Sequence, residues 1–89
     1  MRRQREHKLQ QYIRSVLEIE RKHMSISQTP DAGEVAILYG LLKELETHRQ
    51  EAFSELTAHE LSEDRAANYF LLICQDLSSK INAKLARAQ

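Results

Sequence analysis

Apolar residues recur every three or four positions in three stretches of this chain, which is the spacing expected for one face of an α-helix. The middle stretch begins with a helix-entry signal, in which Thr29 is the N-cap, Pro30 is the first helical residue and Asp31 lies in the first turn. Its apolar positions are Val35, Leu38, Leu41, Leu42, Leu45, Ala52, Phe53 and Leu56. We predict a helix over residues 30–56, roughly 40 Å long at a rise of about 1.5 Å per residue.

The first stretch predicts another helix, from about residue 4 to residue 24. No Gly or Pro interrupts it, and its apolar stripe consists of Leu9, Tyr12, Ile13, Val16, Leu17 and Ile19. Residues 1–8 are mostly charged or polar, and we expect them to form a flexible basic arm. The segment SISQTP after the helix predicts a loop, because Pro30 disfavours helical geometry at Thr29.

The third stretch predicts a helix over residues 63–86. Its main apolar stripe is Ala66, Phe70, Ile73, Cys74, Leu77, Ile81 and Leu85, and Tyr69, Leu71 and Leu72 widen it. The run YFLLIC is apolar nearly all round, which predicts burial on more than one side. Thr57 and Glu60 match a capping box, so we expect a short turn over residues 57–61 before this helix. A bent or continuous helix through that corner is the alternative.

Together these elements predict an all-α fold, a small three-helix bundle in which the first two helices form an antiparallel hairpin and the third packs across them. A chain of 89 residues has room for one domain with a thin core. We therefore expect self-association, as a homodimer with coiled-coil-like packing. Ala36 and Gly40 share one face of the middle helix, which predicts a small-residue notch for a neighbouring backbone. Leucine at position 40 would then overpack that contact.

The charge pattern bears on partners. The formal net charge is zero, which disfavours a generally electropositive nucleic-acid binder. Residues 1–24 contain seven Lys/Arg against three Glu, whereas residues 25–65 contain three Lys/Arg against nine acidic residues. We expect the basic first segment and the acidic middle segment to pack against each other, within the chain or between subunits.

Motifs for catalysis or metal binding do not emerge from the sequence. Cys74 is the only cysteine, and its place in YFLLIC predicts a small buried side chain in a reducing compartment. Glu20 and His23 have the spacing used in di-iron carboxylate bundles, but those sites need the motif twice, and we expect no metal or other cofactor. The sequence contains no glycine-rich phosphate loop and no nucleophile elbow, so we do not expect an enzyme.

The function expected from the sequence is protein binding without catalysis, as an adaptor, chaperone or inhibitor that presents a helical face. The candidate positions, which serve the partner interface or the core, are Val35, Leu38, Leu41, Leu42, Leu45, Phe70, Ile73 and Leu77. Residues 38–42 also match the LxxLL pattern, which we interpret as core packing. No apolar run reaches the ~18 residues that a membrane-spanning helix needs, and we expect a cytoplasmic location without membrane association.

The alternative function is that of a small dimeric regulator whose basic arm contacts DNA or RNA. The arm residues are Arg2, Arg3, Arg5 and Lys8. Such side chains neutralise phosphates, and the resulting binding falls steeply as salt rises.

Overall fold

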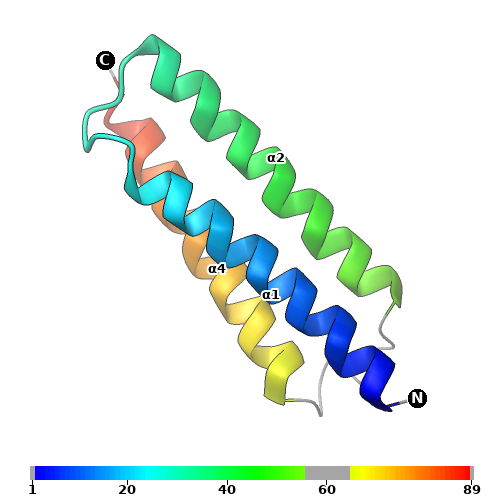
Figure 1. Cartoon of the computed structure of the whole chain (residues 1–89). Helices are drawn as coiled ribbons and strands as arrows, with labels where there is room; N and C mark the ends of the chain where they lie inside the picture. The colour runs from blue at the N-terminus through cyan, green and yellow to red at the C-terminus, as the bar shows by residue number, and fades with distance from the viewer. Residues whose placement is uncertain (1, 56–64, 89) are drawn as a thin grey trace.

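Three long helices make up the computed structural model, which describes residues 2–55 and 65–88, with side chains from Leu9 onward. The helices are α1 (Arg2–Met24), α2 (Ala32–Glu55) and α4 (Arg65–Ala86). Each helix contacts the other two, so the predicted all-α three-helix bundle is confirmed. α2 runs antiparallel to α1, and α4 returns along both, parallel to α1 (Figure 1). The bundle is slim, with extents of 47 × 18 × 17 Å.

The helix bounds differ from the expected ones at two places. α1 begins at Arg2, so most of the segment expected to be a flexible arm continues the helix. The expected turn over residues 57–61, and the expected start of the last helix at residue 63, lie outside the described residues. Because α4 packs back along α2, the two are not one continuous helix.

The start of α2 is set by a capping box formed by Asp31 and Glu34, and the N-cap predicted at Thr29 lies two residues too early. Asp31, rather than Thr29, is the N-cap: its Oδ1 accepts a hydrogen bond from the Glu34 N–H at 2.8 Å, and Glu34 Oε1 accepts one from the Asp31 N–H at 3.2 Å. The backbone N–H and hydroxyl of Ser27 also donate to the Glu34 carboxylate. These hydrogen bonds, those from Ser27 and Asp31 foremost, lower the pKa of Glu34. Pro30 precedes the helix and is buried.

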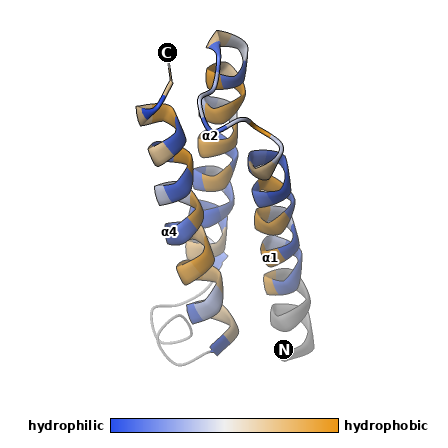
Figure 2. Cartoon of the chain, turned by 90° about the vertical axis from the view of Figure 1, so that its left-hand side faces the viewer, coloured by the Kyte–Doolittle hydropathy of each residue, from blue (hydrophilic) through white to orange (hydrophobic). Residues whose placement is uncertain are grey.

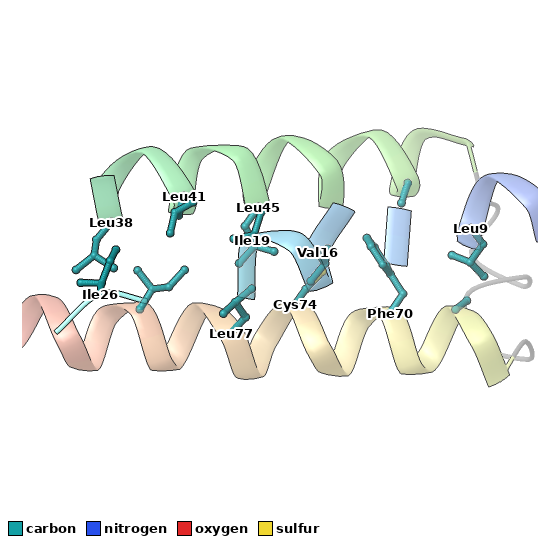
Figure 3. Packing of buried hydrophobic residues seen from close by; sticks show 13 residues of the cluster. Leu9, Val16, Ile19, Ile26, Leu38, Leu41, Leu45, Phe70, Cys74 and Leu77 are labelled. Atoms are coloured by element: carbon teal, nitrogen blue, oxygen red, sulfur yellow. The ribbon is translucent and has the colours of Figure 1, made fainter. Parts of the chain in front are cut away.

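The core runs the length of the bundle as layers of aliphatic side chains around Phe70. Figure 3 shows Leu38, Leu41 and Leu45 pointing from α2 toward α4. In Figure 2 the apolar positions of α1 and α4 follow the sides of these helices that face the bundle centre. The buried apolar residues are Leu9, Val16, Ile19, Ile26, Leu38, Leu41, Leu45, Ala52, Ala67, Phe70, Cys74, Leu77 and Ile81. Cys74 is therefore a buried side chain, as expected, and its burial raises the pKa of the thiol to about 11.

The predicted notch at Ala36 and Gly40 is wrong for packing within the chain. Both residues are exposed, and a Cβ added at Gly40 would meet no atom within 4 Å. The side of α2 that faces the other helices is defined by Leu38, Leu41 and Leu45, and position 40 lies away from it.

Replacing Gly40 with alanine should therefore raise the free energy of unfolding by about 0.5–1 kcal/mol, since alanine loses less backbone entropy in a helix and meets open space here. Urea denaturation measures the change. Ala36→Gly, one turn earlier on the same exposed face, is the matched control and should lower stability by a similar amount. A destabilised Gly40→Ala variant would show that another chain packs closely on this face.

Candidate partner-binding surface

α1 and α4 lie side by side and run in the same direction. Along the line where they meet, each helix has a row of residues spaced three or four positions apart. Met24 of α1 and Lys80 of α4 line one pocket, so they lie where the two helices meet. An electrostatic interaction between Glu20 and Lys80 agrees with this placement. Counting back from these residues in steps of three and four gives two rows, which we call the α1–α4 seam: Ile13, Leu17, Glu20 and Met24 on α1, and Tyr69, Ile73, Asp76 and Lys80 on α4.

The half of the seam nearer the start of both helices consists of apolar side chains, several of which are exposed. Leu17 is 43% exposed, Tyr69 is 49% exposed and Leu72, next to the α4 row, is 63% exposed. Ile13 and Ile73 are partly buried and pack against the core. We call these five residues the outer patch. Exposed apolar residues grouped on one side of a small domain are a common feature of interaction sites, so the outer patch is the candidate partner-binding surface.

The outer patch also corrects the expectation for the YFLLIC run. Its core side, Phe70 and Cys74, is enclosed, whereas Tyr69 is half exposed and Leu72 is mostly exposed. Leu71 and Ile73, on either side of that face, are partly buried and pack against the core, so the predicted burial on more than one side holds for four of the six side chains and leaves Tyr69 and Leu72 exposed.

Exposed apolar residues on α2 do not combine into a comparable surface. Ile37 and Tyr39 are both exposed, but they are two residues apart and so point about 200° away from each other around the helix. Phe53 lies several turns further on, where the guanidinium of Arg49 is 6.0 Å from the centre of its ring. These side chains are separate, and they do not define a face.

The positions proposed from the sequence as interface or core lie in or beside the core. Leu38, Leu41, Leu45, Phe70 and Leu77 are buried. Leu42 and Ile73 are partly buried and pack against the core, and Val35 is also partly buried. The LxxLL segment over residues 38–42 thus supplies core side chains. Leu17, Tyr69 and Leu72 belong to the recognised helical stripes but were not chosen as site residues.

The far end of the seam is polar and contains a buried lysine that sequence reasoning missed. Lys84 is buried, and its Nζ donates hydrogen bonds to the carbonyl oxygens of His23 and Ile26, each at 2.7 Å. Carbonyls in the last turn of a helix lack intrahelical partners, so this ammonium group caps the C-terminus of α1 from α4. Burial lowers the pKa of Lys84, and the charge of Arg87 lowers it further.

His23 lies beside this cap in an unusual state. It is only 6% exposed, and no hydrogen bond of normal length and angle reaches either ring nitrogen. Burial lowers the pKa of His23, and the charges of Lys84 and Lys80 act in the same direction, whereas a hydrogen bond with the Lys80 backbone and the charge of Glu20 act against them. The neutral imidazole is therefore favoured in the folded chain.

The stability of the bundle should consequently fall on mild acidification. The pKa of His23 is lower in the folded chain than in the unfolded one, where it is near 6.5, so its contribution is fully present above about pH 6.5 and is lost as the pH falls below that value. Urea denaturation at about pH 7.5 and about pH 5.5 brackets this window and stays above the range in which carboxylates titrate. His23→Gln should flatten the difference, while His48→Gln, on α2, should retain it. An equal fall in the His23→Gln variant would assign the effect to other groups.

Other predicted features can be placed only in part. Arg2, Arg3, Arg5 and Lys8 belong to the first turns of α1, and their side chains lie outside the described part of the chain. Among the described residues no group of three or more His, Cys, Asp or Glu is arranged to hold a metal ion. None of the three helices described here combines the length and apolar character needed to cross a bilayer.

Comparisons of the chain with protein-family models, with curated proteins and with solved structures found no match. Function must therefore be inferred from the residues and geometry of the chain itself.

Proposed function

We propose that this chain is a non-enzymatic protein-binding module that uses the outer patch on α1 and α4, with a second copy of the chain as its partner. The observation that supports this proposal most is that Tyr69 and Leu72, in the apolar segment YFLLIC, are exposed, as is Leu17 on α1. Covering these side chains removes apolar surface from water, which stabilises association by about 25 cal/mol per Å² before the costs of association are subtracted.

Pairing of two copies is favoured by the dimensions of the bundle. A cross-section of 18 × 17 Å leaves room for one layer of side chains between three helices, so much of each helix surface faces water. Small domains of this kind commonly gain stability by oligomerisation. In a twofold dimer the same patch serves both subunits, and a ridge formed by Tyr69 and Leu72 of one copy can pack against the seam of the other.

Sedimentation velocity over a range from low to high micromolar concentration tests the proposal. The wild type should shift from monomer to dimer, and Leu72→Glu should remain monomeric while its circular dichroism spectrum is unchanged, because an exposed position tolerates a charge in the free bundle. Tyr39→Glu is the matched control: Tyr39 is equally exposed, at 61%, but lies on α2, so this variant should still dimerise. A wild type that is strictly monomeric, or a Leu72→Glu variant that dimerises like the wild type, would overturn the proposal.

A further inference from the structure

A pocket of about 340 Å³ lies at the polar end of the α1–α4 seam, where both helices finish. Its walls include His23 near the end of α1 and Gln28 in the loop that follows. The other wall is provided by Lys80 and Lys84 of α4, and by Arg87 just beyond the end of that helix. We call this the cationic pocket. It is separate from the outer patch, which occupies the opposite half of the seam.

Among the described residues that line the cationic pocket, Lys80, Lys84 and Arg87 are basic and none is acidic. Arg87 Nη1 donates a hydrogen bond to Gln28 Oε1 at 2.7 Å, which orients the guanidinium and uses one of its five N–H donors. Lys84 Nζ uses two of its three donors on the carbonyls of α1. Lys80 is half exposed and pairs with Asp76 at 2.9 Å, a surface contact that competes weakly with a ligand. Hydrogen-bond donors on these positively charged side chains therefore remain available for a further acceptor.

Helix polarity explains part of this arrangement but leaves His23 unexplained. Cations near the C-terminus of a helix are favourable, which accounts for Lys80, Lys84 and Arg87 at the end of α4. His23, however, is more than nine-tenths buried beside these cations, and no hydrogen bond of normal length and angle reaches its ring nitrogens, although buried polar groups in proteins are nearly always hydrogen-bonded. A bound anion would offset the repulsion that a protonated His23 experiences from the neighbouring lysines.

We propose that the cationic pocket binds a phosphate-type anion, either inorganic phosphate or the phosphate group of a monoester. Arg87 would bind two of the phosphate oxygens with its planar fork of N–H groups, and Lys80 and Lys84 would approach as point charges. His23 lines the same pocket with enclosed ring nitrogens, so its ring would respond to the charge of the anion rather than contact it. A tetrahedral phosphate presents acceptor oxygens in several directions, which suits donors that come from α4 and the segment just beyond it better than a planar carboxylate does.

The test is a titration of the ¹⁵N-labelled full chain with inorganic phosphate at constant pH and ionic strength, followed by NMR, with sodium chloride as the blank. We expect saturable shifts at His23, Gln28 and the last turns of α4, and the ring signals of His23 should move while those of His48 stay in place. A second arm with glycerol phosphate distinguishes a monoester ligand from the free ion, since the physiological class should bind more tightly.

Variants at exposed positions make the test independent of folding. The double variant Lys80→Gln/Arg87→Gln removes two exposed cations from the pocket and should weaken phosphate binding at least tenfold. Lys43→Gln, which removes an exposed lysine from α2, should leave the binding unchanged. The proposal fails if the shifts do not saturate, if chloride reproduces them, or if the double variant binds phosphate as the wild type does.

Discussion

Phe70→Ala is expected to lower the free energy of unfolding by about 3–5 kcal/mol, which is the usual cost of removing a buried aromatic ring from a core. Phe70 is fully enclosed at a level where all three helices meet, and its ring lies 6.1 Å from that of Tyr12 on α1. The cavity left by alanine would be lined from α1, α2 and α4 together. Chemical denaturation monitored by circular dichroism measures the loss.

Leu72→Ala provides the control within the same apolar run. Leu72 is exposed, so its truncation should change the stability of the monomer by no more than about 0.5 kcal/mol at low protein concentration. If Phe70→Ala is too unstable to fold, Phe70→Leu should still fold with a loss of about 1–2 kcal/mol. Equal effects at positions 70 and 72 would contradict the assignment of one to the core and the other to the surface.

Lys84→Met is expected to lower the free energy of unfolding by about 2–3 kcal/mol. Methionine preserves most of the buried aliphatic stem, but the Ile26 carbonyl oxygen loses its Nζ donor at 2.7 Å, and the His23 carbonyl oxygen is left with the Ile26 N–H at 3.1 Å. An unsatisfied buried acceptor costs about 1–3 kcal/mol, and water that enters the last turn of α1 would recover part of it. Hydrogen exchange should show the accompanying loosening at the end of α1.

Lys80→Met separates this effect from a general loss of positive charge on α4. Lys80 is one turn earlier and half exposed, and its ion pair with Asp76 joins two residues of the same helix. Such surface pairs contribute about 0.3–0.5 kcal/mol, so this variant should be close to the wild type. If the Lys84→Met variant is as stable as the wild type, the free energy needed to desolvate the ammonium group equals the stabilisation from its two hydrogen bonds.

The helices and most of the core could be predicted because they depend on local pattern. The three-and-four spacing of Leu38, Leu41 and Leu45 identifies the buried side of α2, since any neighbouring helix must cover that side. Gly40 was misassigned because a small residue is compatible with both a close contact and open water, and spacing alone does not distinguish them. The cap of α2 moved from Thr29 to Asp31 because adjacent residues offered competing caps, and the reciprocal bonds with Glu34 favoured the later one.

The candidate sites were harder to predict, because they depend on how distant segments meet. Lys84 appears in the sequence as one cation in a mildly basic segment. Its hydrogen-bond partners, however, are the carbonyls of His23 and Ile26, which precede it by 61 and 58 positions in the chain. His23 looks like part of a solvated run of charges until α4 covers it. Tyr69 and Leu72 share the apolar character of Phe70, and only the angle at which α4 packs decides which of them faces water.

The burial of Cys74 gives this protein an intrinsic reporter of its own opening. With a pKa of about 11, roughly one thiol in ten thousand is ionised at pH 7, and the side chain is 2% exposed in the wall of a pocket between α2 and α4. A disulfide reagent therefore reacts at an appreciable rate only when α2 and α4 move apart at this pocket. Because no other cysteine competes for the reagent, the labelling rate of the unmodified chain measures how often the bundle opens, without any engineered probe.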